Sequence, residues 1–219
     1  MRGIVRAVDS PKPSKRDRTR NALLVALQEL LLEGDPESVS VPQIVKRAGM
    51  AQGTFYNYFD SLPDAVVGVG QLLLQEHVRV LEEVVAGSKD VPEVMARSCK
   101  QALMVAGNRP DIAKLLFDSG VPVDLLLVSM RAHMREDVDR AVETGQVKLS
   151  NPELASALYT GALIAAGNDI YRGRLSLEAV PDVTRMTLGL LGVDSRKADR
   201  LASAPQEFVD WGPLPLSAL

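Results

Sequence analysis

Residues that break helices divide the chain beyond residue 61 into a succession of segments with helical periodicity. Gly, Pro and Asn punctuate this region, and between them apolar residues recur at intervals of three and four, the period of an amphipathic helix. No stretch of useful length alternates apolar with polar residues, so strands are not expected. The pattern predicts an all-α fold, with helices over residues 62–86, 92–107, 110–118, 122–144, 151–168 and 176–191.

Three shorter helices are expected before this region. Leucines at helical spacing predict a first helix with Thr19 as its N-cap. Ser40 and Gln43 have the spacing of a capping box at the start of a second helix, and Gly49 can take the left-handed conformation that ends it. A third helix is expected over about 51–59. Two short helices joined across Ala-Gly-Met form a helix-turn-helix.

Length and composition limit the class of protein. The chain has 219 residues, 46% of them hydrophobic, which suits one compact domain or a small domain fused to a larger one. No apolar run approaches the roughly 18 residues of a membrane span, and we find no signal peptide, so a cytoplasmic protein with no membrane partner is expected. The single cysteine, Cys99, excludes an internal disulfide framework.

The charge is unevenly distributed along the chain. The net charge is −3, yet the segment KPSKRDRTR at residues 12–20 contains five Lys or Arg and one Asp. A mildly acidic body with a basic leading segment fits a protein that presents one end to a polyanion. A solvated, disordered basic tail explains the charge equally well. Residues 1–18 are predicted to form a flexible arm, and residues 195–219 a short charged helix and a loose tail docked by Phe208 and Trp211.

Four of the nine Phe, Tyr and Trp residues lie within AGMAQGTFYNYFDSL, residues 48–62. On a helix over 52–59, Phe55 and Phe59 fall on one side and can anchor the helix in a small core. The opposite side is small and polar, which suits contact with base edges in a major groove. An aromatic-rich core turn is the alternative interpretation. The polar face holds Gly53, Thr54 and Asn57, with Tyr56 and Tyr58 at its edges.

The stretch AGMAQGTFYNYFDS after SVPQIV resembles the DNA-binding signature of the TetR-type bacterial regulators. In that family an Ala-Gly turn precedes a recognition helix of the form x-Gly-Thr-Phe-Tyr-x-Tyr/His-Phe, and the resemblance covers about residues 19–66. It implies a DNA-binding domain at 19–62 and a helical effector-binding and dimerisation domain at 63–194. It also implies a homodimer that reads a palindromic operator in double-stranded DNA. The simplest such regulator is a repressor released by a small, largely apolar effector.

The resemblance also implies roles for individual residues at the DNA. Base pairs would face Gln52, Gly53, Thr54 and Asn57, and phosphates would contact Tyr56, Tyr58 and Ser40. The cations Lys15, Arg16, Arg18 and Lys46 would add backbone contacts, although Lys46 fits a solvated helix end equally well. Two positions depart from the family pattern: Ala51 stands where Ser or Thr usually caps the recognition helix, and Leu62 stands where Lys usually reaches a phosphate.

Pairing is expected through the last two long helices. Residues 151–168 and 176–191 carry small and apolar residues on one face each, so two such helices from each subunit could form a four-helix interface. An ordinary internal core explains the same pattern. The expected interface residues are Leu158, Gly161, Ala162, Ala165, Val183, Met186 and Leu190.

The expected effector pocket depends on Met-rich central helices, because Met side chains adapt to line malleable apolar cavities. Each of these residues could equally be plain core. The polar candidates near one helix end are explained almost as well by helix capping. The expected lining consists of Met95, Cys99, Leu103, Met104, Phe117, Met130, His133 and Met134, with polar contacts from Asn168 and Tyr171.

An enzyme is not expected. The chain has two His and one Cys, and it shows no metal-ligand spacing, phosphate-binding loop or nucleophile elbow. No catalytic residue, metal or cofactor is therefore predicted. The alternative from another class is a protein-interaction or scaffold module that retains the helix-turn-helix without reading a specific DNA sequence.

Overall fold

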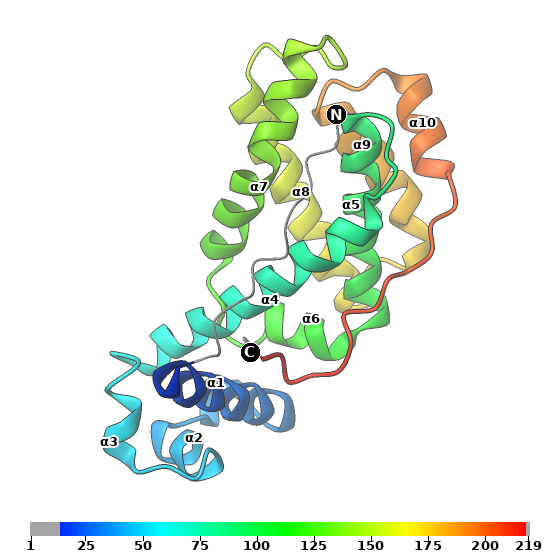
Figure 1. Ribbon diagram of the computed structural model, residues 1–219. Helices are drawn as coiled ribbons and strands as arrows, with labels where there is room; N and C mark the ends of the chain where they lie inside the picture. The colour runs from blue at the N-terminus through cyan, green and yellow to red at the C-terminus, as the bar shows by residue number, and fades with distance from the viewer. Residues whose placement is uncertain (1–13, 218–219) are drawn as a thin grey trace.

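The computed structural model describes residues 14–217, which form ten α-helices and two 3₁₀ turns with no strand in that range (Figure 1). The predicted all-α class is confirmed. The helices are α1 (Lys15–Glu33), α2 (Val41–Arg47), α3 (Gln52–Phe55), α4 (Leu62–Val84), α5 (Val91–Asn108), α6 (Pro110–Phe117), α7 (Val123–Glu143), α8 (Pro152–Tyr171), α9 (Val180–Leu190) and α10 (Ser195–Ser203), and the 3₁₀ turns span Pro36–Ser38 and Leu177–Ala179.

The helices form two parts connected by α4. Figure 1 shows α1, α2 and α3 grouped at one end, while α4 runs from them into a body made of the later helices. Within the body, α5 packs on α8 and α9, α7 packs on α8, and α9 packs on α10. No helix in the described range is both long and apolar enough to cross a bilayer.

The first helix begins earlier than the sequence predicted. Its N-cap is Ser14, whose hydroxyl accepts from the Asp17 amide at 3.1 Å while the Asp17 carboxylate accepts from the Ser14 amide at 3.0 Å. The Asp17 carboxylate also accepts from the Ser14 hydroxyl at 2.7 Å, and this bond, with the one from the Ser14 amide, lowers the pKa of Asp17. Residues 15–18 are therefore helical, and the predicted N-cap at Thr19 is wrong. Residues 1–13 of the predicted arm lie outside the described range.

The third helix is shorter than predicted. α3 ends at Phe55 and continues as turns, in which the amides of Tyr58 and Phe59 donate to the carbonyl of Phe55 at 3.0 and 3.1 Å. Its N-cap, Ala51, makes no side-chain capping bond, which leaves early amides of the helix without the usual acceptor. The rings of Phe55 and Phe59 nevertheless lie 5.4 Å apart and are both buried, as the sequence predicted.

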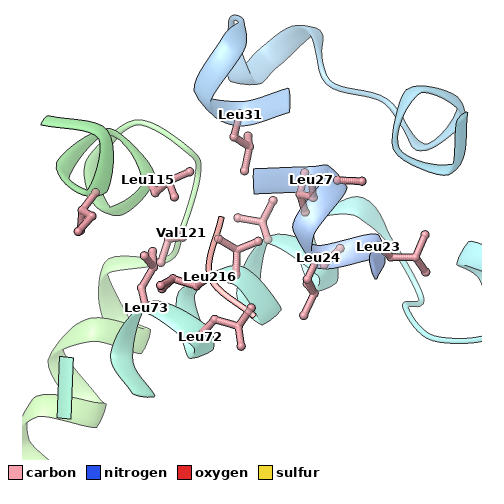
Figure 2. Packing of buried hydrophobic residues seen from close by; sticks show 14 of the residues in the cluster. Leu23, Leu24, Leu27, Leu31, Leu72, Leu73, Leu115, Val121 and Leu216 are labelled. Atoms are coloured by element: carbon pink, nitrogen blue, oxygen red, sulfur yellow. The ribbon is translucent and has the colours of Figure 1, made fainter. Parts of the chain in front are cut away.

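One hydrophobic cluster joins the two parts of the molecule. Figure 2 shows leucines of α1 facing Leu72 and Leu73 of α4, Leu115 of α6, and Leu216 near the end of the chain. All are buried, and each Leu removed from water stabilises the fold by roughly 1.5–3 kcal/mol. The part formed by α1, α2 and α3 is therefore packed against the body by apolar contacts as well as joined to it by α4.

The last described residues follow the prediction in part, since Phe208 and Trp211 do dock the tail on the protein. The short charged helix is present as α10, but the tail expected to be loose is packed on the protein. Residues 204–217, which we call the C-terminal strap, run from α10 along the body and back to α1 (Figure 1). Trp211 and Leu216 are buried and Phe208 packs against the same cluster.

Candidate DNA-contacting surface and effector cavity

Local hydrogen bonds define both ends of α2 and the turn that leads to α3. The Gln43 side-chain oxygen accepts from the Ser40 amide at 2.8 Å and from the Ser40 hydroxyl at 2.7 Å. At the other end of α2, Gly49 has φ +69°, and the Met50 amide donates to the Val45 carbonyl at 2.8 Å. A left-handed glycine followed by such a bond is a common helix C-terminus. It turns the chain sharply toward α3.

The segment that begins at α3 divides into a buried and an exposed side, as predicted. Phe55 and Phe59 are 0% and 2% exposed. The other side of the segment carries the predicted base-contacting residues: Gln52, Gly53 and Asn57 are exposed and Thr54 is half-buried. Tyr56 is 56% exposed and Tyr58 is half-buried.

Cations from α1 lie beside this segment. The guanidinium of Arg16 lies 5.8 Å from the Tyr58 ring centroid, and that of Arg20 lies 5.1 Å from the Phe59 ring centroid. Lys15, Arg16 and Arg18 are exposed on the first turn of α1. Because these residues are helical, their backbone positions are set by α1, and Arg16 lies directly beside the aromatic segment. Residues 15–18 therefore belong to the same surface as α3, although the charge pattern alone could also be explained by a disordered tail.

The two cations at the end of α2 differ. Arg47 forms ion pairs with Glu29 at 3.1 Å and Glu33 at 2.6 Å on α1, and the bonds from Arg47 lower the pKa of Glu33. Its charge holds α2 against α1. Lys46 is exposed, so it is the better placed of the two to meet a phosphate.

The body contains a cavity with two adjoining compartments. The larger, about 220 Å³, lies between α4, α5, α7 and α8, and the smaller is about 80 Å³. Leu74, His77, Met130 and Leu163 line both. Of the residues predicted to line an effector pocket, five do line this cavity: Met95, Met130, His133 and Met134 in the larger compartment, and Phe117 in the smaller.

Three predicted lining residues on α5 point elsewhere, which corrects the sequence assignment. Cys99 is fully buried against α9, with its sulfur 3.5 Å from the Thr187 hydroxyl oxygen, and burial raises the pKa of its thiol. Leu103 is also fully buried in the core of the body, and Met104 is half-buried outside the cavity. The rotation of α5 about its axis decides which of its residues face the cavity, and the periodicity of the sequence does not determine that rotation.

The two predicted polar contacts also lie outside the cavity. Tyr171 donates its hydroxyl to a carboxylate oxygen of Asp118 at 2.7 Å, and Arg172 pairs with the same carboxylate. The Asn168 carbonyl accepts the Arg172 amide at 2.9 Å at the end of α8. These residues close the end of the helix and tie it to the end of α6, so the capping alternative describes them better.

Two residues that sequence reasoning did not assign to the pocket line the cavity. His77 of α4 lies between the compartments, and Trp211 of the C-terminal strap lines the smaller one, with ring centroids 5.7 Å apart. Burial among apolar side chains, assisted by repulsion from His133, lowers the pKa of His77 to about 4, so its imidazole is neutral near pH 7. Helical spacing from Leu73 and Leu74 was the available signal for His77, whereas nothing local indicated Trp211.

The predicted pairing residues form an apolar face on α8 and α9. Leu158, Met186 and Leu190 are 50%, 65% and 37% exposed, which is unusual for large apolar side chains on adjacent helices. Gly161, Ala162 and Val183 are half-buried and Ala165 is exposed beside them.

This combination of helix-turn-helix and helical body also matches known families. Residues 23–61 match the family described as bacterial regulatory proteins, tetR family, and residues 90–204 match the tetracyclin repressor-like C-terminal domain. The chain belongs to the TetR family of bacterial regulatory proteins. It is therefore a helix-turn-helix, DNA-binding transcriptional regulator and not an enzyme.

Individual relatives of this TetR-family protein agree. The uncharacterised HTH-type transcriptional regulator YvdT of Bacillus subtilis is 28% identical over 112 residues, 51% of this chain and 57% of that protein. The match thus spans little more than half the length of that relative. RolR with the ligand resorcinol has the same fold, with TM-score 0.74 and 23% identity over 90% of this chain and 98% of RolR. FadR of Bacillus halodurans is similar at TM-score 0.56 and 19% identity, over 83% and 97% of the two chains.

Proposed function

We propose that this protein is a homodimeric repressor that binds a palindromic operator and is released by a small, largely apolar effector. One observation carries the proposal. A small polar face anchored by two buried Phe rings is joined through the single helix α4 to an apolar cavity. A shift of α4 at the cavity would then move the DNA-contacting surface, and DNA binding would in turn affect the cavity. Action on bacterial DNA would place the protein in the cytoplasm.

At the operator, base edges would face Gln52, Gly53, Thr54 and Asn57 in the major groove. Phosphates would contact Tyr56, Tyr58, Ser40 and Lys46, with Lys15, Arg16 and Arg18 along the backbone. The exposed positions of most of these residues and the ring contact between Arg16 and Tyr58 support this assignment. Phosphate contacts fix orientation whereas base contacts carry sequence information.

The cavity supports a single-ring, mostly apolar effector. Its compartments are small, and Leu, Val and Met are the commonest lining residues. The neutral His77 can donate or accept one hydrogen bond, and His133, Glu82 and Asp137 add polar groups to the larger compartment. RolR has been solved with resorcinol, so single-ring hydroxyaromatics are the first class to test. An effector that binds the DNA-incompetent arrangement better would shift the population away from the operator.

Pairing would bring α8 and α9 of two subunits together through Leu158, Met186 and Leu190, around Gly161, Ala162, Ala165 and Val183. The exposed apolar face supports this interface. Two copies of the recognition segment could then read half-sites about one turn of DNA apart. A monomeric mass at micromolar concentration would count against the interface.

The test is enrichment of binding sites from random DNA with the full chain. We expect a palindrome-like site. Thr54→Ala with Asn57→Ala should relax base preference, at about 1–3 kcal/mol for each lost base contact, whereas Tyr56→Phe should weaken all sites alike. Failure to enrich any site would favour the alternative, a scaffold module that does not read DNA. An unchanged motif in the double variant would refute the base-contact assignment.

A further inference from the structure

The C-terminal strap is held on the body by side-chain amides and cations of α5. Gln101, which is fully buried, donates to the Val209 carbonyl at 2.6 Å and accepts from the Val209 amide at 3.2 Å. Lys100 donates to the carbonyls of Leu201 and Ala204 at 2.5 and 2.6 Å. Further along, Arg109 donates to the Gly212 carbonyl at 2.7 Å. Backbone groups of the strap that lose contact with water on packing are thus hydrogen-bonded to side chains of the body, as buried polar groups generally are.

The far end of the strap is clasped by α1 of the DNA-binding part. Gln28 is fully buried, and its side chain accepts from the Leu216 amide and donates to the Leu216 carbonyl, both at 2.9 Å. Asn21, about two turns earlier on the same face of α1, donates to the Ser217 hydroxyl at 3.0 Å. Leu216 itself lies in the hydrophobic cluster between α1 and α4 (Figure 2). The end of the chain therefore contacts the DNA-binding part directly.

Between these two attachments lies Trp211, which is 5% exposed and lines the smaller compartment of the cavity. Its indole nitrogen is buried and has no hydrogen-bond partner within residues 14–217. Buried indole N–H groups usually find an acceptor. The nitrogen has almost no accessible surface of its own, so an effector oxygen or nitrogen would reach this unpaired donor only when the Trp211 ring moves.

The segment between Trp211 and the clasp at Leu216 is short. Leu216 follows five residues later, and a chain of that length spans at most roughly 17 Å. Pro213 and Pro215 lie between them and restrict the backbone further. A displacement of Trp211 by a molecule in the cavity would therefore have only a short, restricted segment to cross before it reached Gln28.

We propose that the C-terminal strap is a second connection, beside α4, between the effector cavity and the DNA-binding part. Trp211 donates its indole N–H to an acceptor atom of the effector, and the Gln28 clasp passes the displacement of the strap to α1. This proposal rests on the effector-responsive function proposed above. It narrows the effector to an apolar molecule that carries a hydrogen-bond acceptor. The matched family regions end at residue 204, so Trp211 and Leu216 lie outside them, whereas Gln28 lies within the first of them.

The single Trp of the chain provides the measurement. The wild-type protein is titrated with the enriched operator while Trp211 emission and DNA anisotropy are recorded. We expect operator binding to shift the emission of Trp211. Gln28→Met, which keeps the side-chain length and removes both bonds to Leu216, should still bind operator but lose most of that shift.

The matched control is Gln101→Met. Gln101 clasps Val209 through the same pair of bonds, but it lies outside the stretch between Trp211 and α1. The emission shift should therefore survive in this variant. An operator that binds wild type without changing Trp211 emission, or equal losses in the two variants, would overturn the strap as a connection. Absence of any enriched site would instead overturn the proposed function.

The effector contact is tested separately by calorimetry with single-ring hydroxyaromatics, resorcinol first. Trp211→Phe keeps an aromatic ring and removes the N–H. We expect about three- to tenfold weaker effector binding, the loss of one hydrogen bond. Equal effector affinity in the two proteins would refute the contact. A panel in which no member binds wild type would count against the effector class.

Discussion

The DNA-contacting surface and the effector cavity are assembled in different ways. The surface is drawn mainly from residues 40–59, where each side chain is positioned by a turn or cap a few residues away. The cavity takes its walls from α4, α5, α6, α7, α8 and the C-terminal strap. The first can be recognised from a short motif, whereas the second exists only when distant segments pack. Four changes test how far this difference extends.

The largest effect is expected at the anchor of the surface. Phe55→Ala removes a fully buried ring, and such truncations cost about 3–5 kcal/mol. We expect the DNA-binding part to lose cooperative unfolding and operator binding to be abolished, as followed by circular dichroism and anisotropy. Tyr56→Ala, at the exposed neighbouring position, is the control and should weaken DNA binding with little loss of stability. Equal stability of the two variants would show that the surface is not anchored by its Phe side.

The cavity should make stability depend on pH through His77. Its folded pKa of about 4 lies below the unfolded value of about 6.5, so the unfolded chain binds the proton first as pH falls. Stability should therefore drop by about 2 kcal/mol between pH 7 and pH 5, measured by denaturant titration.

The control for this drop is a pair of His variants. His77→Leu should remove much of the pH dependence. His133→Gln removes only a neighbouring repulsion and should leave most of it. If the free energy of unfolding of His77→Leu depends on pH as steeply as that of wild type, a group other than His77 causes the drop in stability.

Substitution of two glycines compares a packed position between α1 and α4 with an exposed position on the DNA-contacting surface. A Cβ at Gly68 of α4 would lie 2.9 Å from Leu24 of α1, whereas one at Gly53 of α3 would meet nothing within 4 Å. Gly68→Ala should cost about 1–2 kcal/mol, because overpacking outweighs the gain in helix propensity. Gly53→Ala should stabilise by about 0.5–1 kcal/mol and weaken operator binding. Thermal unfolding and anisotropy measure both, and a neutral Gly68→Ala would show that α1 and α4 can separate freely.

The smallest effect concerns the cap that the recognition segment lacks. Ala51→Ser supplies an acceptor for the early amides of α3 and should stabilise by about 1 kcal/mol, with tighter operator binding at every sequence. Ala51→Val, which adds bulk without an acceptor, is the control. If both variants bind alike, capping does not limit the surface. Melting temperature and anisotropy report the two effects.

The sequence by itself determined the helices, most of their ends, the Ser40 box, the Gly49 turn and the two-sided recognition segment. These depend on contacts within a few residues, which leave periodic or capping patterns. The start of α1 escaped prediction because Ser14 and Asp17 stand within a run of basic residues.

Tertiary structure alone decided which side of α5 lines the cavity and where the end of the chain lies. Cys99 and Leu103 share the apolar character of Met95 but face other helices, because small rotations decide which residues border a void. Gln28 and Leu216 are 188 residues apart, and a buried Gln in a leucine-rich helix does not indicate its distant partner. The free energy of that contact comes from pairing one backbone amide and carbonyl in the core, which only the folded chain brings within reach.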